Sequence, residues 1–292
     1  KSSSQYDGLK PYMRYKGLTD SDFTPLLHDA IFQDLNKKFT YLNGSKCIVK
    51  EDASSRKLKI QSKMISLIKK YLEDLDKLKS DLFEMALNVE KQIFDSVNLT
   101  QILDIKKANQ IIKNDDKIDK KEKEIRQLAT NTLTKRQPLA DDLRRILIAL
   151  KLSGTIERIA DHAANIAGRM SFVKNIPESY STDSIFQLGT MVLANYAKAI
   201  SSYDKESPKI AKVVPDEDRA INSIYETCFR EHLHIMMEDR DSIGFCTQML
   251  FIAKELERIG DLSKVISKEV LYNVCLLYTS DAADEGLGVD LG

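Results

Sequence analysis

Tryptophan is absent from this sequence of 292 residues, and glycine and proline are scarce, at 11 and 6 residues. Leucine, isoleucine, alanine, lysine, glutamate and aspartate are common instead. Because glycine and proline are the residues least compatible with a helix interior, this composition favours helices over sheets. The length is sufficient for one or two domains with hydrophobic cores of their own.

Net charge, long apolar runs and clustered cysteines are also lacking. Lysine plus arginine and aspartate plus glutamate both number 44, so no overall field attracts nucleic acid or an anionic membrane, and we expect no nucleic-acid partner. The longest apolar runs fall well short of the roughly 20 residues that span a bilayer. The 4 cysteines are scattered, with no C-x-x-C, which is typical of packed thiols in a reducing compartment. We therefore expect a cytoplasmic protein.

Apolar residues recur at steps of three and four from about residue 62 onwards, which predicts long amphipathic helices. The first predicted helix begins near residue 62, and the other five cover 103–133, 139–173, 183–204, 208–238 and 241–273. Short connections predict antiparallel neighbours. The expected fold is therefore all-α, with one three-helix bundle over 62–176 and a second over 183–274. Pro215 is expected to kink or interrupt the fifth helix.

The two ends of the chain show no such periodicity. We expect residues 1–61 to form an N-terminal extension that is loop or partly disordered, with at most one short helix near 25–37. Residues 275–292 end in scattered glycine and aspartate and resemble a translated vector sequence, so we expect a tail without helix that has no part in the fold.

Acidic residues occur on the apolar stripes of two predicted helices. Asp115 and Asp119 continue the stripe of 103–133, and Glu157 and Asp161 continue that of 139–173. Side chains four residues apart on a helix share one face, about 6 Å apart. If these two helices face each other, four carboxylates should converge in the interior.

Buried carboxylates that repel one another require a basic partner, shared protons or a bound cation. Oxygen ligands alone suit hard or borderline ions such as Mg²⁺, Ca²⁺, Mn²⁺ or iron. The pattern therefore predicts a metal site in the first half of the chain. The alternative is that the acids lie at the edge of the stripe, solvated and paired with lysines, in a metal-free helical adaptor.

Several segments resemble the PhoU family, accessory regulators of the phosphate-specific transport system. The segment RQPLADDLRRILIALKLSGTIERIADHAANIA is similar to the family's third helix, and LERIGDLSKVISKEVLYNV is similar to the second copy of it. The segments NDDKIDKKEKEI and DEDRAINSIYETCFREHL resemble the second helices of the two repeats. This resemblance covers about residues 65–274 and implies two tandem three-helix bundles, usually in a homodimer.

The resemblance also implies multinuclear metal clusters, most often of iron, with zinc, manganese, magnesium or nickel as alternatives. Transferred to this chain, the first site would use Asp115, Asp119, Glu157 and Asp161, and the second would use Asp218, Glu257 and Asp261. Two further positions depart from the first repeat, because Asn222 replaces an aspartate and Val265 replaces an asparagine. We therefore expect the second site to be weaker or empty.

The function implied by the resemblance is regulation, without enzymatic activity. The family contacts the ATPase subunit of the phosphate ABC transporter and a phosphate sensor histidine kinase, and it is peripheral to the membrane through these partners. The sequence has no nucleotide-binding phosphate loop, hydrolase elbow or H-E-x-x-H pair. The rival is a di-iron carboxylate enzyme of the ferritin-like type, which requires Glu-x-x-His pairs that this stripe lacks.

Histidines and cysteines outside the acidic motifs are expected to be structural. We expect His162 to lie at the surface or at a helix contact, because it is rotated about 100° from Asp161 around the helix. Cys228 and Cys246 fall on apolar faces and are expected to be small core residues.

Overall fold

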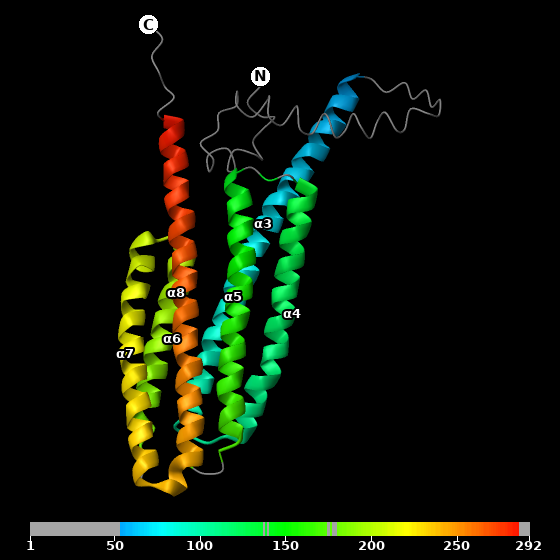
Figure 1. Cartoon of the computed structure of the whole chain (residues 1–292). Coiled ribbons are helices and arrows are strands. Elements are labelled where there is room, and N and C mark those ends of the chain that lie inside the picture. The colour runs from blue at the N-terminus through cyan, green and yellow to red at the C-terminus, as the bar shows by residue number, and fades with distance from the viewer. Residues whose placement is uncertain (1–52, 137, 139, 174–175, 177–179, 286–292) are drawn as a thin grey trace. The chain divides into compact units, whose positions relative to one another are not determined.

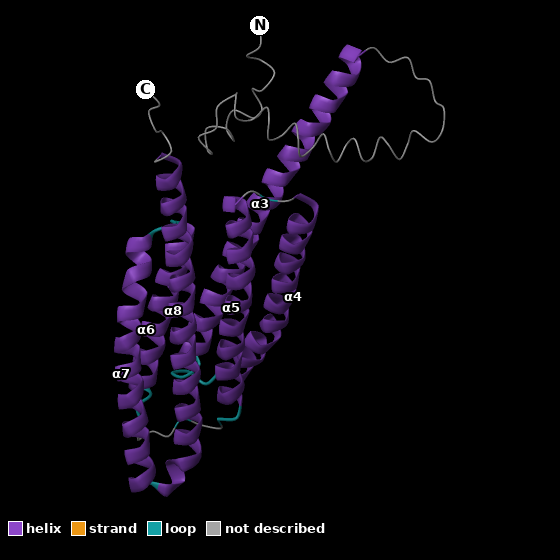
Figure 2. Ribbon diagram, turned by 45° about the horizontal axis from the view of Figure 1, so that its top comes forward, coloured by secondary structure: helices purple, strands orange, loops and turns teal. Residues whose placement is uncertain are grey.

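The computed structural model describes residues 53–136, 138, 140–173, 176 and 180–285, and every regular element among them is helical (Figure 2). The α-helices are α3 (Ala53–Asn98), α4 (Ile105–Arg136), α5 (Ala140–Ser171), α6 (Asp183–Asp204), α7 (Pro208–Glu238) and α8 (Ile243–Glu285), with a 3₁₀ turn η1 (Arg240–Ser242) before α8. The predicted all-α class is confirmed. The short helix expected near 25–37 lies outside the described residues.

The chain divides within α3 into two units, residues 1–73 and 74–292. The first unit is described only from Ala53, as the beginning of α3. The second unit contains the rest of α3 and all the other helices of the described residues.

Both ends of the helical region extend further than the sequence pattern predicts. Helix α3 begins at Ala53 instead of near residue 62, and α8 continues to Glu285 instead of ending near 273. The prediction of a tail without helix from residue 275 is therefore wrong as far as Glu285. The physical reason is that no glycine or proline occurs between Gly260 and Gly286, so nothing in the backbone chemistry stops the helix earlier.

Helix α7 runs unbroken across Pro215, so of the two expected outcomes, a kink or an interruption, the interruption does not occur. A proline inside a helix removes one hydrogen bond and costs about 3 kcal/mol. Buried residues on both sides of it, Val214 and Ile221 among them, pack α7 against its neighbours. This packing outweighs the local cost and keeps the helix continuous.

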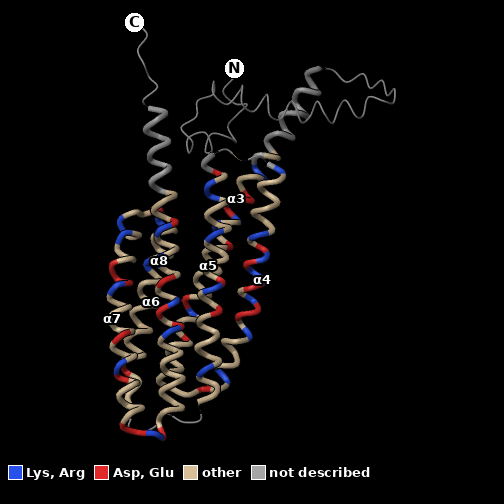
Figure 3. The backbone as a smooth tube through the Cα atoms, viewed as in Figure 1, with Lys and Arg blue, Asp and Glu red and all other residues tan. Residues whose placement is uncertain are grey.

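Consecutive helices of each bundle are antiparallel, as predicted; α3 lies beside α4 and α5, and α6 lies beside α7 and α8 (Figure 1). Two ion pairs show the direction of α3 against α4. Lys107 contacts Asp95 at 2.8 Å, and Lys121 contacts Asp81 at 2.9 Å, so residue numbers fall along α3 as they rise along α4. In the second set, α6, α7 and α8 all contact one another. Charges of both signs are interspersed along α4 and α7 (Figure 3).

One continuous hydrophobic core joins the two bundles. The hydroxyl of buried Tyr196 on α6 donates a hydrogen bond to the carbonyl of Ala86 on α3 at 3.0 Å. Glycine is needed at position 189, because a Cβ there would lie 2.6 Å from both γ-carbons of Val97. Helices α5 and α8 also pack together, and Lys151 of α5 forms an ion pair with Glu269 of α8 at 2.6 Å.

Candidate metal centre

The four acidic residues expected to form the first site lie beside the core stripe and do not replace it. Asp115, Asp119 and Glu157 are half-buried, and Asp161 is exposed. The prediction that these acids occupy interior positions is therefore wrong. Steps of three and four describe neighbouring stripes of a helix equally well, and burial selects the stripe that contains the apolar residues Ala108, Ile111, Ile118, Ile125 and Ala129 of α4.

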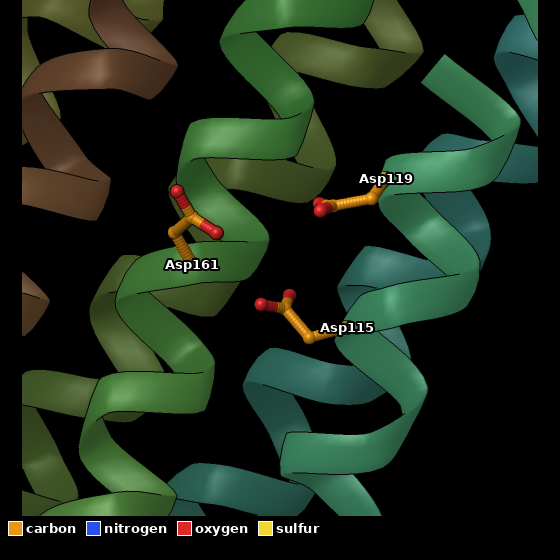
Figure 4. A group of neighbouring side chains, drawn as sticks. All are labelled: Asp115, Asp119 and Asp161. Atoms are coloured by element: carbon orange, nitrogen blue, oxygen red, sulfur yellow. The ribbon is translucent and has the colours of Figure 1, made fainter. Parts of the chain in front are cut away.

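Of the four acids expected to converge, three do so. Asp115 and Asp119 project from successive turns of α4 towards Asp161 of α5 (Figure 4). Each carboxylate offers one oxygen atom, and these oxygens all lie within 4.8 Å of one another. Among the described residues, this is the one group of three potential ligand side chains gathered so closely. We call Asp115, Asp119 and Asp161 the aspartate triad.

Glu157 lies outside the aspartate triad, although it is one helical turn from Asp161. Burial raises the pKa of Glu157, and the charges of Asp161 and Asp119 raise it further. Glu157 is therefore an electrostatic neighbour of the triad, and the structure does not bring its oxygens within the same distance as the other three.

The electrostatics of the triad disfavour its own negative charge. Burial raises the pKa of Asp115 from 3.8 to about 6; a hydrogen bond from Gln92 opposes this shift, and the charges of Asp161 and Asp119 add to it. The three carboxylates in their ionised form therefore repel one another in a partly desolvated place.

Gln92 fixes the position of Asp115 and was missed by the sequence reasoning. Its amide nitrogen donates to Asp115 Oδ1 at 3.2 Å and to the carbonyl of Ala160 at 3.1 Å. This buried side chain of α3 thus connects α4 and α5 directly behind the triad. The sequence signal for this role was that Gln92, a polar residue, lies three residues after the apolar residue Val89 and directly before Ile93, both of which belong to the apolar stripe of the first helix.

Basic side chains near the triad are paired with other acids. Lys121 contacts Asp81 and Glu84, and Arg126 contacts the buried Glu122. Within the described part of the chain, no lysine or arginine forms an ion pair with a member of the triad. Clustered carboxylate oxygens without a counter-charge form a suitable set of ligands for a hard or borderline cation.

The acids of the second repeat are arranged differently. Asp218 of α7 is buried and pairs with Lys264, which also contacts Asp261 of α8 at 2.7 Å. Glu257 pairs with Lys254 at 2.7 Å. The structure thus brings Asp218 and Asp261 together around a lysine ammonium group, whereas Glu257 has a lysine of its own.

Of the described histidines and cysteines, His162 lies at a helix contact and Cys228 and Cys246 lie in the core, as expected. His162 Nδ1 lies 2.7 Å from Glu255 Oε2 of α8, which makes it a contact between helices. Cys228 and Cys246 are free, fully buried thiols, and burial raises the pKa of both. His232 is buried between the hydroxyl of Tyr180 and the carbonyl of Cys228.

Together, the two bundles of antiparallel neighbours and the aspartate triad define a class of duplicated helical proteins that carry a carboxylate cluster between two helices. The family model described as PhoU domain matches residues 82–170 and 185–270. The chain belongs to the PhoU family.

Relatives of known name support this membership. The chain is 34% identical over 215 residues to the phosphate-specific transport system accessory protein PhoU homolog of Zymomonas mobilis, which covers 74% of this chain and 91% of that protein. A homolog of the same name from Xylella fastidiosa is 34% identical over 206 residues, with coverage of 70% and 87%.

Two solved structures share the fold. The crystal structure of PhoU from Pseudomonas aeruginosa superposes with a TM-score of 0.67 at 30% identity, covering 70% of this chain and 98% of that one. The phosphate transport system regulatory protein PhoU from Streptococcus pneumoniae gives a TM-score of 0.65 at 22% identity, with coverage of 76% and 100%. The second likeness concerns the fold alone.

The raised pKa of Asp115 predicts an unusual pH dependence for the metal-free protein. The folded-state pKa of about 6 exceeds the unfolded value of 3.8, so the folded state binds more protons between these values. The contribution of Asp115 to the free energy of unfolding is therefore fully present below the pKa of the unfolded state, and it is lost as the pH rises through the pKa of the folded state. Asp115→Asn should stabilise the metal-free protein at pH 7 by on the order of 1–2 kcal/mol, discounted for solvent screening, and should have little effect at pH 4.

This prediction is measured by urea unfolding of chelator-treated protein at both pH values. Asp116→Asn is the matched control, because Asp116 is an exposed acid of the same helix outside the triad. An equal gain from both substitutions at pH 7 would show that general surface charge, and not the triad, is responsible.

Proposed function

We propose that this chain is an accessory regulator of phosphate-specific transport whose first repeat holds a metal ion or cluster. The observation that carries the proposal is the 34% identity over 91% of the length of a protein named for that role. Proteins of the same name from Xylella fastidiosa and Clostridium acetobutylicum also align with this chain over most of their own length.

The metal-binding part of the proposal rests on the aspartate triad. Asp115, Asp119 and Asp161 supply the oxygen ligands, and Glu157 is the nearest further candidate. A cation there would remove the repulsion among the carboxylates and link α4 to α5. We expect iron in a multinuclear cluster, with manganese, magnesium, zinc and nickel as alternatives, since carboxylate oxygens suit hard and borderline ions.

Regulation is proposed to act through protein contacts at the cytoplasmic side of the membrane. No described helix has the length and apolar character needed to cross a bilayer, so the membrane association of such a regulator would come from its partners. The proposed partners are the ATPase subunit of the phosphate ABC transporter, a phosphate sensor histidine kinase and a second copy of this chain.

A regulator is favoured over a di-iron enzyme by the composition of the site. The triad consists of three aspartates, whereas ferritin-like di-iron sites use glutamates together with Glu-x-x-His pairs. The proposed role of the metal is therefore to stabilise the pair of helices α4 and α5, without turnover of a substrate.

Complementation tests this function directly. In a bacterial strain that lacks its own PhoU homolog, the full chain should lower expression of a phosphate-starvation reporter in high phosphate, and it should co-purify with the transporter ATPase. The variant carrying both Asp115→Asn and Asp161→Asn should lose most of this repression, and Asp116→Asn should retain it. A folded wild-type chain that neither represses the reporter nor binds the ATPase would contradict the proposal.

A further inference from the structure

The acidic motifs of α5 and α8 are repeats of each other, spaced one hundred positions apart. Glu157 and Asp161 of α5 correspond to Glu257 and Asp261 of α8. The two copies differ at two positions beside these acids. Three residues before the glutamate, Gly154 of α5 is replaced by Lys254 of α8. Three residues after the aspartate, Ala164 is replaced by Lys264. The second repeat thus carries two positive charges that the first repeat lacks.

Lys264 occupies the place between the acids of α7 and α8. Its ammonium group donates to Asp218 Oδ2 and to Asp261 Oδ1, the latter at 2.7 Å. The Asp218 side chain is 2% exposed and that of Lys264 is 25% exposed, so this contact is largely removed from solvent. An ammonium group shared by carboxylates from both helices takes the position that a bound cation would need.

The electrostatics of Lys264 keep this cation charged. Burial lowers the pKa of Lys264, but the hydrogen bonds to Asp218 and Asp261 outweigh burial and raise it overall. Lys254 neutralises the remaining acid of the motif, because it donates to Glu257 at 2.7 Å. A divalent ion would therefore meet positive charge at Lys254 and Lys264 in the second repeat, whereas the corresponding residues of the first repeat, Gly154 and Ala164, are uncharged.

We propose that Lys264 is a built-in cation that occupies the carboxylate site of the second repeat and confines metal binding to the first repeat. This inference rests on the proposed metal site of the first repeat for its comparison, but its own test does not require that site. Competition by this internal ammonium group would be the physical cause of the weaker or empty second site that the sequence predicts.

Two oxygens near Lys264 supply further potential ligands. Asp218 Oδ1 and Asn222 Oδ1 are buried and accept no hydrogen bond from the described protein. Gly260 allows α8 to approach this place, because a Cβ there would lie 3.3 Å from Asp218 Oδ1. Without the ammonium group, Asp218, Asn222 and Asp261 would form an oxygen ligand set suited to Mn²⁺.

The test uses Mn²⁺ binding to the full chain in a background where the first site is disabled by Asp161→Asn. Calorimetry and metal analysis after dialysis should show no Mn²⁺ binding by Asp161→Asn alone. Adding Lys264→Ala should create a Mn²⁺ site, and Mn²⁺ should then raise the melting temperature of the double variant by at least roughly 5 °C, by preferential binding to the folded state. Lys198→Ala is the matched control, since it removes an exposed lysine that pairs with Glu217 of α7, and it should create no site.

Opposite results would overturn the inference. Mn²⁺ binding by Asp161→Asn that disappears on Asp218→Asn would show that Lys264 does not block the second site. Failure of the double variant to bind Mn²⁺, or to fold in saturating Mn²⁺, would show that the ammonium group does not stand in for a metal. Lys264→Gln, which keeps a hydrogen-bond donor without the charge, is the second variant and should also gain Mn²⁺ binding.

The outcome also separates this inference from the proposed function. If the wild-type chain binds no Mn²⁺ but the double variant does, the first-repeat site fails and the role of Lys264 stands. If the wild type binds Mn²⁺ through Asp161 but the double variant does not, the first-repeat site stands and the role of Lys264 fails.

Discussion

Asp161→Asn is expected to weaken Mn²⁺ binding to the first repeat at least about a hundredfold, because even the loss of a partner outside the ligand shell costs 10–100-fold in metal affinity. Asp161 is the only member of the aspartate triad that α5 contributes. Its replacement therefore removes a negative charge and leaves the ion without a triad ligand from α5. Calorimetric titration of chelator-treated protein measures the change in dissociation constant.

The same substitution should stabilise the metal-free protein while removing its response to metal. One fewer charge reduces the repulsion that contributes to the raised pKa of Asp115. Asp116→Asn should leave both the affinity and the response unchanged. Equal Mn²⁺ affinity in the wild type and Asp161→Asn would exclude the triad as the binding site.

Glu255→Ala is expected to cost about 2–3 kcal/mol of folding free energy, which is the second large effect. Glu255 is 5% exposed and accepts hydrogen bonds from His162 at 2.7 Å and Arg169 at 3.4 Å, both on α5. Arg169 also stacks over the ring of Phe251 at 4.3 Å. Removing the carboxylate leaves these partly buried donors without an acceptor at the contact between the bundles.

Thermal unfolding measures this effect, and a fall in melting temperature of roughly 5 to 10 °C is expected for a unit of this size. Lys151→Ala provides the matched control, because its ion pair with Glu269 joins the same two helices at an exposed position and should contribute less than about 1 kcal/mol. If both substitutions lower the melting temperature equally, burial of Glu255 has no special importance for the α5–α8 contact.

The helices were predictable because their signals are local and repeated. Steps of three and four specify α4 to α7 to within a few residues, since Pro208 begins α7 and turn residues separate the elements. The ends of α3 and α8 were not predictable from apolar periodicity, because polar residues with good helix propensity continue a helix without a stripe. Pro215 shows that tertiary packing can outweigh a local breaker.

The meeting of Asp115, Asp119 and Asp161 was predictable from their spacing, but their burial was not. Whether a helix position is interior or peripheral depends on how the helix is rotated against its neighbours, and this rotation is set by all the apolar residues together. The role of Gln92 was beyond the pattern for the same reason, because its partners come from two other helices. The lysines of the second repeat were visible in the sequence, but only their contacts show which acids they neutralise.

Anomalous X-ray diffraction from crystals grown with Mn²⁺ would locate an ion bound by the aspartate triad. We expect an anomalous peak between α4 and α5, with carboxylate oxygens of Asp115, Asp119 and Asp161 about 2.0–2.3 Å from it, and no peak beside Lys264. A map with no peak at the triad, or with the strongest peak between Asp218 and Asp261, would contradict this expectation.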